Sequence, residues 1–96
     1  MPEERRCWRI KEEKLVSNLL DRLPIQVLKK YEFWKEIIYE EGPMGLRRRK
    51  GFHDESLEGE RRGERSSRLN IKWRVIYRID KNVVTVYVED VTPHKY

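Results

Sequence analysis

Residues 65–89, RSSRLNIKWRVIYRIDKNVVTVYVE, decide the fold of this chain. They contain three segments rich in β-branched and aromatic residues, which predict strands at Arg65–Asn70, Trp73–Ile79 and Val83–Glu89. Turn-forming residues separate these segments, at Asn70–Lys72 and Asp80–Asn82. Because both connections are short, the three strands are predicted to form an antiparallel meander.

Alternation along the strands assigns each side chain to one face of the sheet. One face is apolar and should pack against helices; it carries Leu69, Trp73, Val75, Tyr77, Ile79, Val84, Val86 and Val88. The other face is expected to be open and basic; it carries Ser66, Arg68, Lys72, Arg74, Ile76 and Arg78, with Tyr87 and Glu89 beside them.

Residues 12–41 show a helical period instead. A first apolar stripe consists of Leu15, Leu19, Leu20 and Leu23, and a second of Ile25, Leu28, Tyr31, Trp34, Ile37 and Ile38. Pro24 suits the boundary between two helices, and Gly42-Pro43 should end the second. We therefore predict an α+β fold, in which an N-terminal antiparallel helical hairpin packs on one face of a small twisted antiparallel sheet. A short first strand is expected at Cys7–Lys11.

The length of 96 residues fits one domain, residues 1–96, with a modest core. Residues 42–63 are rich in glycine and charge and predict an exposed connection with a short strand near Leu57. No apolar run approaches the roughly 18 residues that a membrane span needs, and residues 1–6 lack the apolar core of a signal peptide. These features predict a cytoplasmic protein.

The net charge of +5 is unevenly distributed. Residues 1–41 hold equal numbers of basic and acidic side chains, so the whole excess lies in residues 42–96. A basic half beside a neutral half suggests a polyanionic partner, although a solvated basic surface would give the same pattern. One cysteine and two histidines exclude a disulfide framework and make a metal centre improbable, so none is predicted.

Two arginines mark the candidate site. A turn centred on Ile71 would make Arg68 and Arg74 cross-strand partners, with β-carbons about 5 Å apart. Like charges in that position destabilise a sheet, so an anionic ligand would explain their pairing. They could instead be surface cations held by Glu89 and Asp90. The last predicted strand ends beside Arg74, and the chain after it would bring His94 and Tyr96 to the same place; Glu55 lies at the entry to the sheet.

These side chains suit cleavage of RNA without a metal. A carboxylate or imidazole can take the proton of the ribose 2′-hydroxyl, which then attacks the adjacent phosphate. Guanidinium groups stabilise the charge that develops on the phosphorane, and a histidine can protonate the departing 5′-oxygen. The product would be a 2′,3′-cyclic phosphate. Arg47, Arg48 and Arg49 could add unspecific phosphate affinity, as could Lys72 and Arg78.

The ordered set of motifs resembles the RelE superfamily of toxin–antitoxin ribonucleases, and most of all its YoeB and HigB branches. The set comprises Leu57-x-Gly59, Gly63, Ser66-x-Arg68, Trp73-Arg74 followed by Val75-Ile76-Tyr77, and the terminal His94-x-Tyr96. The resemblance implies a ribosome-dependent mRNA endoribonuclease. By this resemblance Glu55 is the general base, Arg74 the transition-state arginine, His94 the general acid, Tyr96 the terminal tyrosine and Arg68 the second phosphate-binding arginine.

The resemblance also implies the partners: a cognate antitoxin protein, mRNA in the ribosomal A site and ribosomal RNA, with no small-molecule cofactor. Two alternatives stay open. A ParE-like toxin of the same fold would inhibit DNA gyrase by binding, without cleaving anything. An inactive member would act only as an antitoxin-binding or autoregulatory module.

Overall fold

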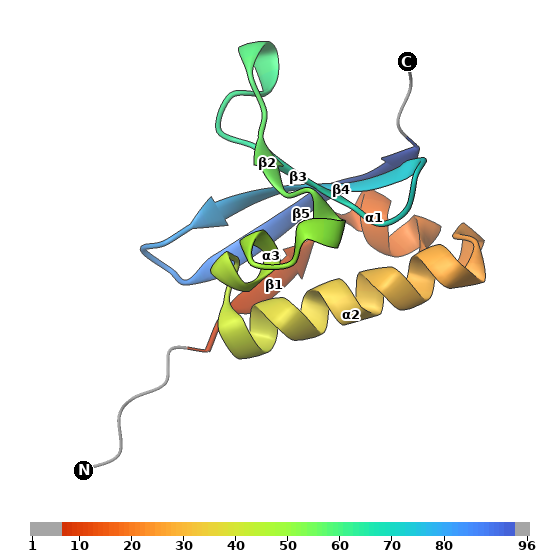
Figure 1. Cartoon of the computed structure of the whole chain (residues 1–96), viewed down its shortest axis with the longest axis horizontal. Coiled ribbons are helices and arrows are strands. Elements are labelled where there is room, and N and C mark those ends of the chain that lie inside the picture. Colours follow the sequence, from red (N-terminus) through yellow and green to blue (C-terminus); the bar gives the residue numbers. More distant parts are fainter. Residues whose placement is uncertain (1–6, 94–96) are drawn as a thin grey trace.

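The computed structural model describes residues 7–93, which form a five-stranded sheet with helices on one face (Figure 1). The strand order across the sheet is β1-β5-β4-β3-β2. The strands are β1 (Arg9–Glu12), β2 (Glu55–Ser56), β3 (Arg65–Arg68), β4 (Trp73–Asp80) and β5 (Thr85–Pro93). The three later strands form the predicted meander, and the α+β class is confirmed.

The prediction of a wholly antiparallel sheet was wrong at one edge. β1, which overlaps the short strand expected at Cys7–Lys11, pairs with β5 in parallel, with Arg9 opposite Thr85 and Glu12 opposite Val88. The helices after β1 carry the chain to β2 at the opposite edge of the sheet, and the strands that follow return across it to place β5 beside β1. All other neighbouring strands are antiparallel.

The helical region begins with α1 (Lys14–Leu19) and a short 3₁₀ helix, η1 (Leu20–Arg22), and continues with α2 (Ile25–Glu41). Pro24 precedes α2, where its missing N–H removes no helical hydrogen bond. The chain leaves α2 at Gly42, whose φ of +77° favours glycine and whose N–H donates to the Ile38 carbonyl. The two helix boundaries that the sequence predicted are therefore present.

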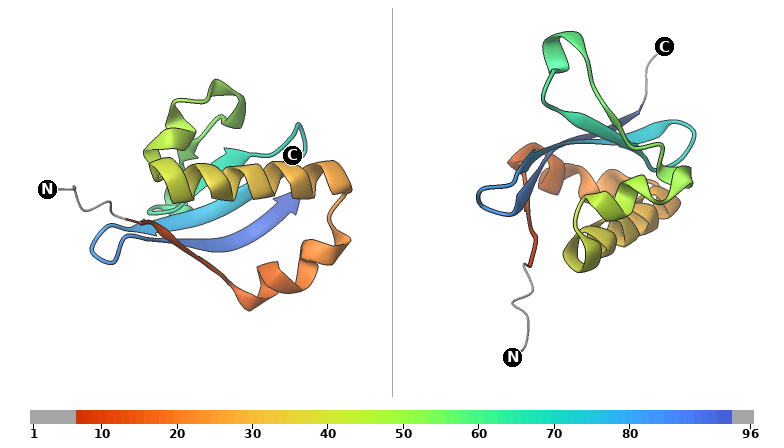
Figure 2. Two further views of the ribbon diagram at one scale, coloured as in Figure 1. Left: turned by 90° about the horizontal axis from the view of Figure 1, so that it is seen from below. Right: turned by 60° about the vertical axis from the view of Figure 1, so that its left-hand side comes forward.

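The predicted helical hairpin is only partly observed. Its first arm is six residues of α-helix plus a tight turn, and it packs against β5 and β1, while α2 crosses the sheet face (Figure 2). Two members of the predicted apolar stripes are also exposed: Leu15 by 60% and Ile25 by 63%. Val16 and Val27 take the buried positions instead, because the packing of the helices against the sheet selects them for the core.

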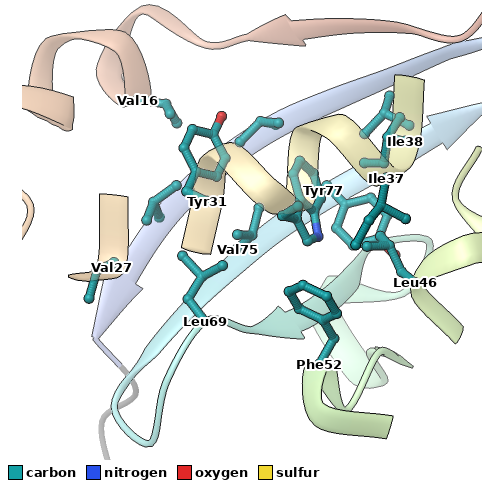
Figure 3. Close-up of a cluster of buried hydrophobic side chains, with 14 of the residues drawn as sticks. Val16, Val27, Tyr31, Ile37, Ile38, Leu46, Phe52, Leu69, Val75 and Tyr77 are labelled. Atoms are coloured by element: carbon teal, nitrogen blue, oxygen red, sulfur yellow. The ribbon is translucent and has the colours of Figure 1, made fainter. Parts of the chain in front are cut away.

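The core lies between α2 and the sheet (Figure 3). The rings of Trp34 and Tyr77 meet edge to face with centroids 5.3 Å apart, and Tyr31 stacks on Trp34 at 5.7 Å. The predicted apolar face is confirmed for Leu69, Trp73, Val75, Tyr77, Ile79, Val86 and Val88. Val84 was predicted wrongly, because it lies in the turn before β5 with a φ of +50°.

A bulge in β5 changes the end of the sheet. Ile76 pairs with Asp90 but Tyr77 pairs with Val88, so Glu89 is the extra residue. After the bulge Val91 returns to the core face and is buried. The strand therefore continues to Pro93 and does not end at Glu89 as predicted.

Candidate active site

Three further short elements frame the site: α3 (Met44–Arg47), η2 (Lys50–Phe52) and η3 (Gly59–Arg61). α3 and η2 lie beside α2, whereas the segment that carries η3 projects from the sheet on the side away from the helices (Figures 1 and 2). The predicted connection 42–63 is thus ordered around these elements and contains β2.

Arg68 and Arg74 are cross-strand partners, as the turn spacing predicted. Asn70 holds the turn, because its side-chain oxygen accepts hydrogen bonds from the backbone N–H groups of Lys72 and Trp73, both at 2.8 Å. A single Asx-type turn therefore sets Arg68 opposite Arg74 on neighbouring strands. Arg68 is not among the residues that line the pocket at Arg74.

Glu55 reaches the same place from β2. It pairs with Ser66 of β3, and its Oε1 lies 3.9 Å from Nη1 of Arg74. The same Arg74 nitrogen donates a hydrogen bond to Ser66 Oγ at 3.3 Å. The Arg74 side chain is only 18% exposed, whereas that of Glu55 is 60% exposed. The carboxylate is thus accessible and the guanidinium is held in position.

The end of β5 completes the site as far as the structure describes it. Thr92 pairs with Arg74, and Pro93 pairs with Trp73. The expected path of the chain toward the arginines is therefore followed to Pro93. His94 and Tyr96, the predicted acid and terminal tyrosine, lie outside the described residues.

A pocket of about 370 Å³ opens at this point. It is lined by Leu57, Arg61, Ser66, Arg74, Ile76, Thr92 and Pro93. The prediction of a fully open face was wrong here, because Ser66 and Ile76 are buried. The sequence analysis missed Arg61 as a member of the site; its signal was the pair of glycines, Gly59 and Gly63, whose positive φ angles turn the segment back.

The other predicted phosphate contacts are placed differently. Lys72 is exposed in the turn. Arg78 pairs with Glu89 at 3.2 Å and lies over the Tyr87 ring. Glu89 therefore pairs with Arg78, whereas Arg74 pairs with Glu55.

The basic run at Arg47–Arg49 is not part of this pocket. Both Arg48 and Arg49 form ion pairs with Glu41, at 3.6 and 2.8 Å, near the C-terminal end of α2. The hydrogen bond between Arg49 and Glu41 lowers the pKa of Glu41 and raises the pKa of Arg49. Arg47 lines a separate hollow with Trp8 and Met44. The structure therefore does not bring this run to the paired arginines.

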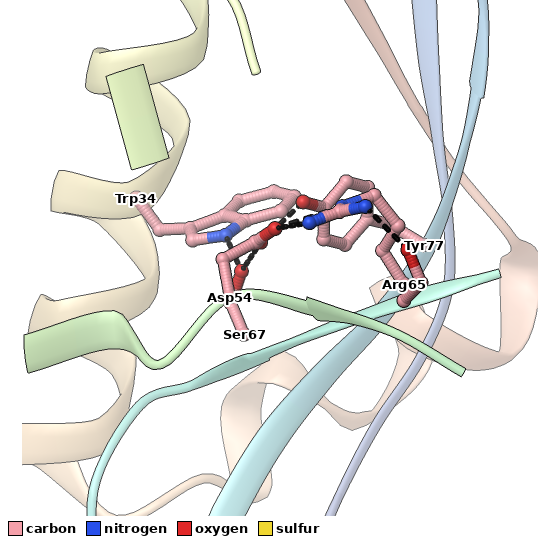
Figure 4. A network of polar contacts seen from close by, with 6 residues as sticks. Trp34, Asp54, Arg65, Ser67 and Tyr77 are labelled. Carbon is pink, nitrogen blue, oxygen red and sulfur yellow. Dashed lines mark hydrogen bonds and ion pairs between the residues drawn. The ribbon is translucent and has the colours of Figure 1, made fainter. Parts of the chain in front are cut away.

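A buried polar network is built around Asp54, the residue before Glu55 in the chain (Figure 4). The fully buried carboxylate of Asp54 accepts hydrogen bonds from Ser67 Oγ at 2.6 Å and from the Tyr77 hydroxyl, and it pairs with Arg65 at 2.6 Å. Trp34 Nε1 donates to Ser67 Oγ at 2.9 Å. Burial raises the pKa of Tyr77, and the Asp54 charge raises it further. Burial opposes the charge of Arg65, but Asp54 outweighs it and the pKa of Arg65 is raised.

A pair of carboxyl groups lies near the pocket. The pKa of Glu64 is raised because a hydrogen bond with the Glu89 carboxyl favours its protonated form, and burial adds to the effect. Arg61, at 3.3 Å from Glu64, opposes this shift without cancelling it. Glu64 and Glu89 therefore lie next to each other, and each also pairs with an arginine: Glu64 with Arg61 and Glu89 with Arg78.

The chemistry of the site follows from its donors and acceptors. Among residues 7–93 no group of histidine, cysteine, aspartate and glutamate side chains is arranged to hold a metal ion. No helix in the described part of the chain is long and apolar enough to cross a membrane. The guanidinium of Arg74 can bind a phosphodiester, and the accessible Glu55 carboxylate beside it can accept a proton from a neighbouring hydroxyl.

No protein-family model matches the sequence, and comparison with curated proteins gives no match either. Solved structures do match. The RelE of an archaeal RelE–RelB complex from Pyrococcus horikoshii is 25% identical, with a TM-score of 0.72 over 92% of this chain and 96% of that chain.

Two further structures have lower identity and show the fold alone. A YoeB/ParE toxin from Agrobacterium tumefaciens is 17% identical, with a TM-score of 0.73 over 91% of this chain and 99% of that one. A heterotetrameric YoeB–YefM toxin–antitoxin complex from Staphylococcus aureus gives 17% identity and a TM-score of 0.68, over 93% and 98%. The chain therefore has the fold that these RelE and YoeB toxins share.

Proposed function

We propose that this protein is the toxin of a type II toxin–antitoxin system and that it cleaves mRNA on the ribosome without a metal ion. The observation that carries the proposal is the position of Glu55, whose carboxylate lies 3.9 Å from Arg74 beside the Arg68–Arg74 pair. A gyrase inhibitor or a simple binding module has no need of a carboxylate at that point. The substrate would be met in the cytoplasm, and residues 1–96 would act as one toxin domain.

In the proposed reaction Glu55 takes the proton of the ribose 2′-hydroxyl, and the resulting alkoxide attacks the adjacent phosphorus. Arg74 and Arg68 bind the non-bridging oxygens, where charge accumulates in the transition state. His94 protonates the 5′-oxygen that leaves, and Tyr96 contacts the base or the phosphate. The products are a 2′,3′-cyclic phosphate and a 5′-hydroxyl.

The positions of Thr92 and Pro93 support the roles of His94 and Tyr96. Thr92 pairs with Arg74. His94 follows Thr92 by two positions, so the chain that carries it leaves the sheet beside Arg74. Fully extended chain spans roughly 3.3–3.6 Å per residue, which keeps His94 within reach of the pocket. Lys72 and Arg78 would contact the RNA backbone further out, and Arg47, Arg48 and Arg49 would add to affinity for ribosomal RNA.

The partner would be an antitoxin. The similar solved structures include toxins in complex with RelB and with YefM. On α2, exposed apolar side chains lie next to lysines and form a surface to which an amphipathic segment of the antitoxin would bind. An antitoxin with acidic residues would also complement the net charge of +5.

A gyrase inhibitor is the second candidate, because one structural neighbour carries the name YoeB/ParE. Glu55 and His94 distinguish the two functions, because only cleavage requires them.

The test is expression of wild type, Arg74→Ala and His94→Gln in cells without antitoxin. We expect growth arrest with mRNA cleavage for wild type and loss of both in the variants. Cleavage that persists undiminished in both variants would refute the assignment, and supercoiling defects without cleavage would favour gyrase.

A further inference from the structure

The residue proposed as base sits on a strand that has little support of its own. β2 is two residues long, and both Glu55 and Ser56 are exposed. Within residues 7–93, its only strand partner is β3. A general base must be positioned relative to the substrate hydroxyl with a precision of a fraction of an ångström. One short edge strand is not rigid enough to do this alone.

One guanidinium supplies that support. Arg65 Nε donates to Asp54 Oδ1 at 2.8 Å, and Arg65 Nη1 donates to Ser56 Oγ at 2.8 Å. Asp54 and Ser56 are the residues immediately before and after Glu55. Because consecutive side chains in extended chain point to opposite faces, the bridge lies on one side of β2 and leaves Glu55 on the other, beside Arg74. We call the unit of Asp54, Ser56 and Arg65 the Arg65 clamp.

The clamp is itself fixed to the core. Asp54 is buried and binds Ser67 of β3 and Tyr77 of β4, and Ser67 accepts from Trp34 of α2 (Figure 4). Side chains of two strands and a helix therefore hold the carboxylate that Arg65 grips. Motion of β2 would have to break these bonds in a buried, low-dielectric place, where they are strong.

We propose that Arg65 is a positioning residue, which holds Glu55 in register with Arg74 through the paired contacts to Asp54 and Ser56. The inference rests on the proposed ribonuclease function and deepens it. Only arginine can make both contacts, because its planar fork binds two acceptors at fixed spacing, whereas lysine presents a single point charge. Arg65 touches neither substrate nor Glu55 and acts through the backbone of β2.

The test is a double-mutant cycle on the single-turnover rate of mRNA cleavage. Ser56→Ala removes one arm of the clamp and leaves the buried network intact; Arg65→Lys removes the fork but keeps the charge. We expect each to lower the rate by about tenfold. In a Glu55→Gln background the same changes should have no further effect, because there is no base left to position. An equal loss in both backgrounds would overturn the proposal.

A second measurement is independent of activity. Hydrogen exchange at the amides of residues 55–57 should be at least about fivefold faster in Arg65→Lys and in Ser56→Ala, with the amides of β4 unchanged. Unchanged exchange at 55–57 would overturn the clamp. Ser17→Ala, which removes an exposed hydroxyl on α1, is the matched control for both readouts. Wild type that cleaves no RNA would refute the proposed function, while the exchange data would still decide whether the clamp exists.

Discussion

Tyr77 shows how one hydroxyl connects the core to the site. Its ring packs against Trp34, and its hydroxyl donates to the buried Asp54 carboxylate. Tyr77→Phe keeps the ring and removes the donor, so a buried charge loses one partner. We expect a loss of about 2 kcal/mol in the free energy of unfolding, measured by urea denaturation.

Tyr39→Phe is the control for that change, because the Tyr39 side chain is half exposed on α2. Its effect should stay within about 0.5 kcal/mol. Equal stabilities for the Tyr77 variant and wild type would mean that Asp54 does not depend on the hydroxyl.

Glu64 gives a pH dependence with a defined sign. Its pKa is raised in the folded protein by Glu89, so the native state holds this proton more tightly than the unfolded chain. The stability that Glu64 contributes is therefore complete below its ordinary value of 4.5 and is lost as the pH rises through the raised pKa. Glu89 and Arg61 are the charged groups that act on Glu64, and Arg78 pairs with Glu89.

Glu64→Gln should remove the loss of stability that occurs as the pH rises through the raised pKa of Glu64. At pH 7 we expect the variant to be about 0.5 kcal/mol more stable than wild type, after allowance for solvent screening and the lost surface ion pair with Arg61. Thermal unfolding at pH 4 and pH 7 measures the difference, which should shrink at pH 4. Glu60→Gln, on the exposed η3, is the control. A variant less stable than wild type at pH 7 would contradict the assignment.

At the scale of elements, α2 ends at Gly42 for two reasons. The φ of +77° disfavours any side chain, and a β-carbon there would lie 2.6 Å from the Trp8 indole nitrogen. Gly42→Ala should therefore cost about 2 kcal/mol in urea denaturation. Gly51→Ala is the matched control, because a β-carbon at Gly51 meets nothing within 4 Å and should change stability little. Equal costs at both positions would refute this account of the helix end.

The elements also show what the sequence could predict. Local signals were sufficient for the ends of α2 and for the Asn70 turn, because Pro24, Gly42 and Asn70 act on their own backbone. The parallel pairing of β1 and the bulge at Glu89 depend on how distant segments meet, and no local pattern specifies that. The exposure of Leu15 has the same cause, since packing against β5 selected Val16 for the core.

At the scale of the whole molecule, the candidate site combines the end of β5 with a loop, a turn and an edge strand that are distant in sequence. The pairing of Arg68 with Arg74 was predictable because turn length fixes register. The approach of Glu55 agrees with the resemblance to the RelE superfamily. The Asp54 network and the covering of Ser66 and Ile76 were not predictable, because both depend on tertiary contacts of the segment 53–64.

In the proposed function, this site cleaves mRNA on the ribosome through the ribose 2′-hydroxyl. The most direct measurement supplies purified toxin to programmed ribosomes and analyses the ends of the cleaved mRNA. We expect a 2′,3′-cyclic phosphate, no cleavage when the scissile nucleotide is 2′-deoxy, and a loss of at least about 100-fold in rate for Arg74→Ala. Cleavage of the 2′-deoxy mRNA, or an undiminished rate with Arg74→Ala, would contradict it.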